Sequence, residues 1–148
     1  MVKSMDGDVR VLAVTSEEMQ QVLSKQLAPL GISVIRAGRA LEIARLVGKG
    51  IVFQVAILPA ESSDAEWWAI WGELCLIDPR PEILVYTRSP TFQLWTGVLD
   101  TGGFDVIVQP FSDVEIQQAV LRAVQCLQQR AKAMRSAGRK TRPAVSSQ

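Results

Sequence analysis

Five short apolar runs, each followed by a segment of helical periodicity, constrain the fold of this chain most strongly. The runs are rich in Val and Ile and show little polar alternation, which is typical of strands buried on both faces of a parallel sheet. They fall at 9–14, 32–37, 51–58, 83–86 and 106–108. Strict alternation of strands and helices predicts an α/β fold in which helices cover both faces of one parallel sheet.

The length and the composition predict a single domain. The chain has 148 residues, of which 48% are hydrophobic, so it can bury a core without disulfides or a metal ion. The last acidic residue is Glu115, and the apolar helical pattern fades near Arg130. We therefore expect a disordered N-terminus at 1–8, a domain at 9–129 and a basic, disordered tail at 130–148.

Several classes of site are absent from the sequence. There is no histidine, and the first strand is followed by TSEE instead of a glycine-rich phosphate loop. Cys75 and Cys126 are isolated within apolar helical patterns, so we expect buried free thiols and a cytoplasmic location. No apolar run reaches the roughly 18 residues of a membrane span, and we expect no export signal. We expect no cofactor.

Polar residues and prolines stand at the carboxyl ends of the predicted strands. Thr15 and Ser16 follow the first strand, and Thr87 ends the fourth. Pro59 follows the third strand, and Gln109 with Pro110 follows the fifth. Because ligands gather beyond the carboxyl ends of parallel strands, we expect these residues to share one edge.

Two segments of the sequence, together with the order of strands and helices, resemble those of a known family. The segments LDTGGFDVIVQPF (99–111) and EILVYT (82–87), together with the strand–helix order, are similar to receiver domains of two-component response regulators. The resemblance covers residues 9–128. It implies a flavodoxin-like, CheY-like (βα)5 three-layer sandwich with a five-stranded parallel sheet in the order 2-1-3-4-5.

The resemblance also implies a phosphoryl-transfer site, which this chain does not carry over. In the family an acidic pair after strand one and an aspartate after strand three hold Mg²⁺, and that aspartate accepts the phosphoryl group. Here the acidic pair falls on Thr15 and Ser16, and the acceptor falls on Pro59. A slip of one residue gives only Leu58 or Ala60.

The two residues that bind phosphoryl oxygens in the family are carried over only in part. The family's lysine after strand five falls on Gln109, and only Thr87 matches its threonine or serine after strand four. By the same resemblance, Pro110 is expected to follow a cis peptide bond.

The leading hypothesis is a degenerate receiver that is not an enzyme and acts by binding a protein partner or a second copy of itself. In receivers, the face made of the fourth helix, fifth strand and fifth helix commonly mediates such contacts. Trp95, Leu99, Phe111 and Leu121 are the candidate interface residues on that face. Burial of Trp95 in the core is the alternative for that residue.

Two other functions stay open. Thr15, Ser16, Thr87 and Gln109 could form a neutral pocket for a small ligand, or could hydrogen-bond to one another and to loop backbone. The basic tail could contact nucleic acid non-specifically, although it has no aromatic residues and no DNA-binding motif, so a solvated tail is favoured. An enzyme of flavodoxin-like fold has no nucleophile, metal set or phosphate loop here to support it.

Overall fold

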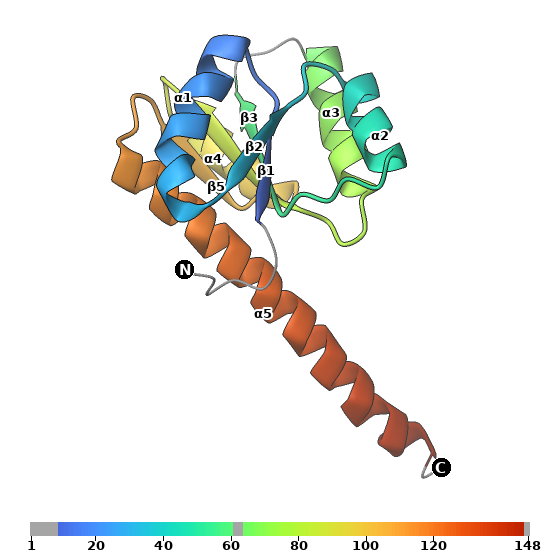
Figure 1. Ribbon diagram of the computed structural model, residues 1–148. Coiled ribbons are helices and arrows are strands. Elements are labelled where there is room, and N and C mark those ends of the chain that lie inside the picture. Colours follow the sequence, from blue (N-terminus) through green and yellow to red (C-terminus); the bar gives the residue numbers. More distant parts are fainter. Residues whose placement is uncertain (1–8, 61–63, 147–148) are drawn as a thin grey trace.

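The computed structural model describes residues 9–60 and 64–146, with side chains described at 9–60 and 65–136 (Figure 1). One sheet of five parallel strands has the order β2-β1-β3-β4-β5. The strands are β1 (Arg10–Ala13), β2 (Ser33–Arg36), β3 (Val55–Pro59), β4 (Glu82–Thr87) and β5 (Asp105–Val108). The helices are α1 (Glu17–Leu27), a 3-10 turn η1 (Ala28–Leu30), α2 (Ala40–Gly48), α3 (Asp64–Cys75), α4 (Phe92–Asp100) and α5 (Asp113–Ser146). The predicted fold class and strand order are confirmed.

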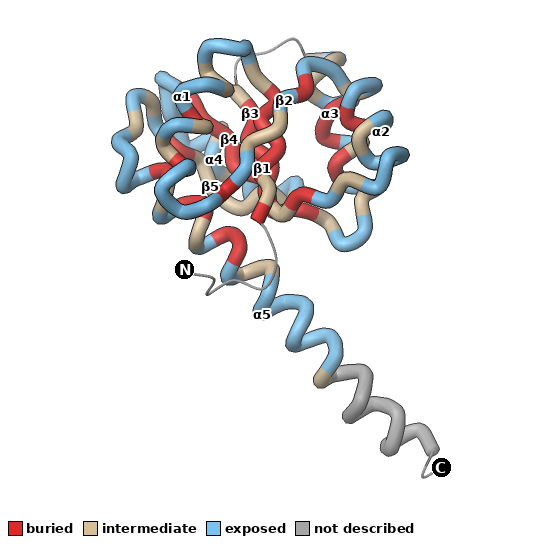
Figure 2. The backbone as a smooth tube through the Cα atoms, in the orientation of Figure 1, coloured by how far each residue is buried: buried red, intermediate tan, exposed pale blue. Residues whose placement is uncertain are grey.

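Two apolar clusters hold three layers together, and Figure 2 shows that the buried residues lie mostly in the strands and on the inner helix faces. On one face of the sheet, α1 and α5 contribute Leu23, Leu27, Ile116, Val120 and Val124. On the other face, α2, α3 and α4 contribute Ile43, Ile70, Trp71, Leu74 and Val98. Both faces of the sheet are therefore covered, as a parallel sheet requires.

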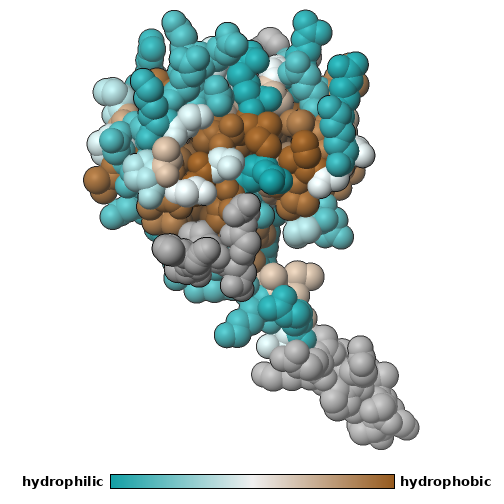
Figure 3. All heavy atoms as spheres, viewed as in Figure 1, coloured by the Kyte–Doolittle hydropathy of each residue, from teal (hydrophilic) through white to brown (hydrophobic). Residues whose placement is uncertain are grey.

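In Figure 1, the edge strand β2 lies at the front of the sheet, between α1 and α2. Val34 and Ile35 on this edge are only half-buried. Figure 3 shows apolar residues gathered in the middle of this face, with hydrophilic residues around them.

The parallel register brings the carboxyl ends of the strands to one edge. Backbone hydrogen bonds continue the ladder past the strands, from Val14 N to Ile57 O at 2.9 Å and from Ala60 N to Tyr86 O at 2.9 Å. Between the ends of β4 and β5, Gln109 N donates to the Thr87 carbonyl at 2.8 Å. These bonds fix the loops in which the predicted site residues lie.

The third strand is shorter than predicted. It spans Val55–Pro59 instead of 51–58, and Pro59 is its last residue instead of lying beyond its end. Gln54 N donates to the Arg10 carbonyl at 2.9 Å, and the Gln54 side-chain oxygen accepts from Arg10 N at 2.7 Å. Val52 is half exposed, so the residues before Val55 do not form a strand buried on both faces.

The prediction that both cysteines are buried is wrong. Cys75 is exposed, because the buried face of α3 is formed by Ile70, Trp71 and Leu74, and each helical residue turns the next by about 100°. Cys126 on α5 is half-buried. Burial, together with the nearby Glu82 carboxylate, raises the pKa of the Cys126 thiol.

Helix α5 continues past Arg130, where the apolar helical pattern fades, and ends at Ser146, while the predicted bounds of the domain and of its tail stay predictions. Its packed face ends near Leu127, and Figure 2 shows the helix becoming exposed as it leaves the domain. The segment QQRAKAM (128–134) consists of residues with high helix propensity. Loss of the apolar stripe therefore marked the end of packing, not the end of the helix. The predictions for 1–8 and 147–148 lie outside the described residues.

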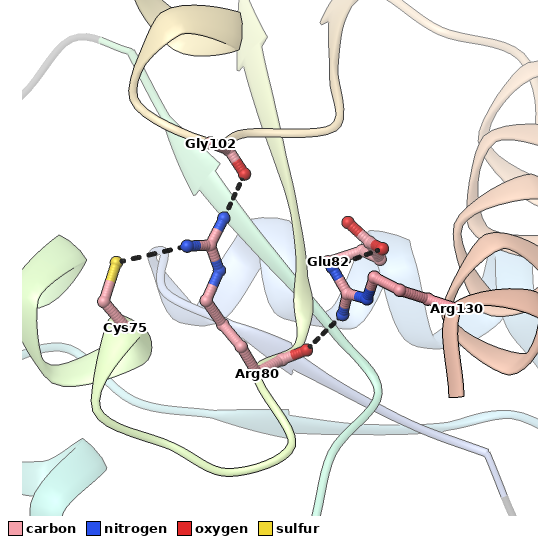
Figure 4. Close-up of polar contacts among 5 residues, drawn as sticks. All are labelled: Cys75, Arg80, Glu82, Gly102 and Arg130. Carbon is pink, nitrogen blue, oxygen red and sulfur yellow. Dashed lines mark hydrogen bonds and ion pairs between the residues drawn. The ribbon is translucent and has the colours of Figure 1, made fainter. Parts of the chain in front are cut away.

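A polar cluster at the amino end of β4 anchors α5 where it leaves the domain (Figure 4). Arg130 places its Nη1 atom 3.2 Å from the Glu82 Oε2 atom and donates from Nη2 to the Arg80 carbonyl at 3.0 Å. The Glu82 contact is an ion pair by distance but lacks hydrogen-bond geometry, so Oε2 is buried without a hydrogen-bond partner among the described residues. The Arg130 guanidinium thus compensates a buried carboxylate.

The glycine turn between α4 and β5 is tied to the same cluster. Arg80 donates a hydrogen bond from Nη2 to the Gly102 carbonyl. Gly102 has a φ of 96°, a conformation that favours glycine, and a Cβ there would collide with the Arg80 guanidinium. This turn is the first part of the GGFDVIVQPF segment.

Arg130→Met is expected to lower the free energy of unfolding by about 1–2 kcal/mol, because it leaves a buried charge uncompensated. The value lies below that for a fully buried pair, since 41% of the Arg130 side chain is exposed against 6% of Glu82. Urea denaturation measures the change.

Arg135→Met is the matched control, because Arg135 is exposed on the same helix and forms no ion pair with another described residue. The double variant Glu82→Gln/Arg130→Met should regain part of the loss. Equal midpoints for Arg130→Met and Arg135→Met would contradict the role given to the pair.

Candidate functional site

A cavity opens at the carboxyl edge of the sheet, where the loops after β1, β4 and β5 meet. Its volume is ≈ 450 Å³. The lining residues are Thr15, Ser16, Met19, Tyr86, Arg88, Ser89 and Gln109. Three of the predicted site residues therefore lie together, and the expectation of a shared edge is correct for them.

The loop after β1 supplies Thr15 and Ser16. Ser16 is the N-cap of α1, and its Oγ atom accepts a hydrogen bond from Met19 N at 3.2 Å. Capping satisfies one of the unpaired amides at the start of a helix, which explains why a serine precedes Glu17. The Thr15 carbonyl accepts from Arg36 Nε at 2.9 Å, so the end of β2 also supports this loop.

The side chain of Tyr86 crosses the middle of the edge. Its hydroxyl and the Thr15 hydroxyl share a hydrogen bond at 2.5 Å. Since β3 lies between β1 and β4, this contact passes across the end of β3, where Pro59 lies. The Tyr86 ring also packs edge-on against Phe111, with centroids 6.3 Å apart.

Sequence reasoning missed Tyr86, although a signal was available. It is the chain's only tyrosine, and it stands one residue before Thr87 on a buried strand. A buried tyrosine hydroxyl requires a hydrogen-bond partner, and the end of the neighbouring strands is the nearest polar region.

The remaining predicted site residues do not line the cavity. Thr87 is buried, and its Oγ1 atom accepts from Ser89 N at 3.1 Å. Pro59 is half-buried, and its carbonyl accepts from Trp67 Nε1 at 2.9 Å. The Gln109–Pro110 peptide is cis, as the resemblance implied, and Pro110 is exposed.

The cavity is not neutral, so the prediction of a neutral pocket is wrong. Arg88, a cationic residue that directly follows Thr87, is exposed and is one of the residues that line the cavity. The predicted set held only residues at the strand ends, and Arg88 is the next residue of the loop after β4. Its place in the lining follows from the fold of that loop.

The residues at this edge do not fit a divalent cation. Mg²⁺ binds through carboxylates and other oxygen ligands, and no lining residue carries a carboxylate. Among the side chains described at 9–60 and 65–136, no group of three or more Asp, Glu, Cys or His residues could hold a metal ion. Thr15, Ser16 and Pro59 carry no carboxylate.

A second surface lies on α4. Phe92, Trp95 and Leu99 recur at helical spacing and are 79%, 50% and 46% exposed, while Leu94 and Val98 of the same helix turn toward the core. Trp95 is therefore not a core residue, which decides between the two alternatives for it. On the adjacent edge strand β5, Val108 is 46% exposed.

The other two candidate interface residues are less accessible. Phe111 is half-buried and packs against the apolar cluster beneath α1 and α5. Leu121 on α5 is half-buried, and next to it Arg122 forms an ion pair with Asp105 at 3.6 Å. The most exposed apolar part of this face is therefore the α4 stripe, Phe92, Trp95 and Leu99.

Trp67 and Trp68 of α3 border a second cavity, of ≈ 310 Å³, between α3 and α4. Trp67 stacks on the buried Trp71 with centroids 4.8 Å apart, whereas Trp68 is 54% exposed. The cavity is lined on the α4 side by Gln93, Leu94, Gly97, Val98 and Thr101. It is separate from the cavity at the carboxyl edge, with which it shares no lining residue.

No protein-family model and no curated protein matches this chain. Solved structures with the same fold do match. The signal receiver domain of a protein described as a LuxO repressor from Vibrio parahaemolyticus has a TM-score of 0.71 at 12% identity, covering 85% of this chain and 97% of that one. A response regulator from Thermotoga maritima has a TM-score of 0.69 at 17% identity, covering 80% and 98%.

A third structure, a protein described as related to pilus assembly in Burkholderia pseudomallei, has a TM-score of 0.68 at 21% identity, covering 84% and 96%. At these identities the likeness shows the fold alone. The chain thus has the flavodoxin-like fold of response regulator receiver domains. Among the described residues, no helix combines the length and the apolar character needed to cross a membrane.

Tyr86→Phe is expected to lower the free energy of unfolding by about 1 kcal/mol, because it removes the hydrogen bond to Thr15 while keeping the ring. Urea denaturation of Tyr86→Phe, Thr15→Val and the double variant forms a double-mutant cycle. The double variant should lose less than the sum of the single variants. Strict additivity would contradict a direct bond between the two hydroxyls.

Proposed function

We propose that this chain is a pseudo-receiver, a signalling domain that keeps the receiver fold and works without forming an acyl phosphate. The observation that carries this proposal is Pro59 at the end of β3, where the family has its phosphoacceptor aspartate. Proline has no side-chain nucleophile. Neighbouring Leu58 and Ala60 have none either, so a small shift in alignment does not supply one.

The groups that would assist phosphoryl transfer are replaced as well. Phosphoryl transfer depends on positioning and on neutralising the transferred charge, commonly with a metal ion and a cation. Thr15 and Ser16 are neutral, and Gln109 stands where the family has lysine. The Tyr86 side chain also passes across the end of β3, where its hydroxyl hydrogen-bonds to the Thr15 hydroxyl. Loss of the nucleophile, the metal ligands and the lysine together leaves no phosphoryl-transfer mechanism, and we assign no enzymatic activity.

The proposed activity is protein binding through the face of α4, β5 and α5, with a second copy of the chain as the first candidate partner. The α4 stripe offers Phe92, Trp95 and Leu99, and exposed aromatic residues are frequent anchors of interfaces. The only charged residue of α4 is Asp100. A nearly uncharged helix face beside an open edge strand suits a contact that excludes water.

The setting we propose is cytoplasmic signalling or assembly. Isolated cysteines are consistent with a reducing compartment, and one structure of the same fold is described as related to pilus assembly. A partner from such an assembly is therefore an alternative to self-association. The exposed α5 helix, with no acidic residue after Glu115, would contact nucleic acid at most non-specifically.

Incubation with a small phosphodonor and Mg²⁺ is expected to leave the intact mass unchanged, because none of Leu58, Pro59 and Ala60 has a carboxylate. Mass spectrometry of the whole protein measures this directly. A receiver domain that carries the full acidic set serves as the positive control under the same conditions. A phosphoryl adduct on this chain would overturn the central claim.

Trp95→Ala is expected to weaken self-association at least about tenfold, since removal of a central interface aromatic commonly costs 2 kcal/mol or more. Sedimentation equilibrium over a range of concentrations measures the dissociation constant. Trp68→Ala is the matched control, because Trp68 is as exposed but lies on α3.

Equal effects of the two tryptophan substitutions would move the contact away from the α4 stripe. A wild-type protein that stays monomeric at the highest concentration would remove the second copy as the partner. In that case an unlike protein would have to occupy the face.

A second candidate function is small-molecule sensing at the carboxyl edge. The cavity of ≈ 450 Å³ favours it, because ligand pockets commonly range from about 300 to 1,000 Å³. A ligand that binds only the folded state would raise the melting temperature. The chemistry of the lining limits which ligands are possible.

A further inference from the structure

We propose that the cavity at the carboxyl edge binds a small organic anion, with a carboxylate or phosphate group, directly through Arg88 and without a metal ion. This inference rests on the part of the proposed function that excludes an acyl phosphate here. It does not depend on the α4 surface. It names the ligand class for the second candidate function.

The charge of the cavity is the first support. Arg88 is the only charged residue in the lining. Within the described part of the chain, no carboxylate forms an ion pair with it, and its guanidinium donates no hydrogen bond. A guanidinium has donors and no acceptor, and its planar fork matches an oxyanion with two oxygens. The group best suited to meet it is therefore an oxyanion.

Neutral donors converge on the same cavity. The Gln109 carboxamide and the Ser89 hydroxyl form no hydrogen bond with another described residue. The Ser16 oxygen accepts from Met19 N, which leaves its own proton able to donate. An oxyanion held by Arg88 would thus find further donors from the loops after β1 and β5.

Charges of both signs surround the cavity, which limits the number of anionic groups that a ligand can place there. The amino end of α1 opens at Ser16 and favours negative charge. Glu17 and Glu18 in the first turn oppose it, but both are exposed and neither lines the cavity. Arg36, which bonds to the Thr15 carbonyl, adds a positive charge beside this loop, and the Glu42 carboxylate partly offsets that charge. The pKa of Glu42 is lowered by a hydrogen bond from Gly38 N and, to a smaller extent, by the Arg36 guanidinium. Favourable charge is therefore concentrated near Arg88, so we expect one anionic group instead of several.

The apolar part of the lining argues for an organic anion over an inorganic one. Met19 and the ring of Tyr86 form part of the wall, and Tyr86 is almost fully buried. A short apolar group attached to the anion could displace water from these side chains, which is favourable. The lining contains no carboxylate, so recognition does not use a bridging divalent cation.

The test is isothermal titration in EDTA at constant ionic strength, with propionate, glycerol 3-phosphate and inorganic phosphate as probes and glycerol as the uncharged control. At least one organic anion is expected to bind saturably and to raise the melting temperature, and glycerol is not. Arg88→Gln should weaken that binding at least about tenfold, the usual scale for a hydrogen bond to a charged group.

Arg45→Gln is the matched control, because Arg45 is exposed on α2 and does not line the cavity. Circular dichroism of both variants checks that the fold is kept. The proposal is overturned if no organic anion binds, if Arg88→Gln binds as tightly as wild type, or if binding requires Mg²⁺. Inorganic phosphate binding as tightly as the organic probes would remove the apolar wall from recognition and overturn the organic assignment.

The two proposals can fail separately. A phosphoryl adduct in the intact mass would refute the pseudo-receiver. Anion binding in EDTA concerns only the non-covalent site, and its loss in Arg88→Gln would not depend on any covalent product.

Discussion

Parallel pairing of five strands is the constraint on which the rest of this structure depends. It requires apolar residues on both faces of the sheet, so helices must cover each face, and it directs every strand's carboxyl end to the same edge. The register then decides which loops meet. The cavity between the loops after β1, β4 and β5 is a consequence of that register, whatever chemistry its residues provide.

By the proposed function, the carboxyl edge of the sheet keeps the receiver fold without the receiver's charge. Receiver chemistry needs a concentration of carboxylates that a metal ion balances. Here hydroxyl groups and an amide line the cavity, a tyrosine bridges β4 and β1, and Arg88 contributes a positive charge. By the two proposals, this site would attract an anion where receiver chemistry requires a metal cation. This reversal links the proposed loss of phosphoryl transfer to the proposed binding of a small organic anion.

At the amino end of β4, a polar cluster connects α5 to the sheet. The buried carboxylate of Glu82 is balanced by Arg130, at the point where α5 passes beyond the domain. The neighbouring Arg80 ties this region to the glycine turn that precedes β5. The turn between α4 and β5 is thus tied, through Arg80, to the point where α5 leaves the domain.

The sequence alone determined the fold class, the strand order through the family resemblance, and the residues at the strand ends, because hydrophobic periodicity and turn residues act locally. It also indicated the cis peptide before Pro110. Only the tertiary structure decided that Tyr86 reaches Thr15 across β3, that Arg88 lines the cavity, that Trp95 and Cys75 are exposed, and that Arg130 meets Glu82. These contacts join residues far apart in the chain, and burial depends on which helix face meets the sheet. A local sequence pattern shows neither which distant residues meet nor which face of a helix packs on the sheet. Helix α5 extends beyond its packed face for a related reason, because high helix propensity continues where packing stops.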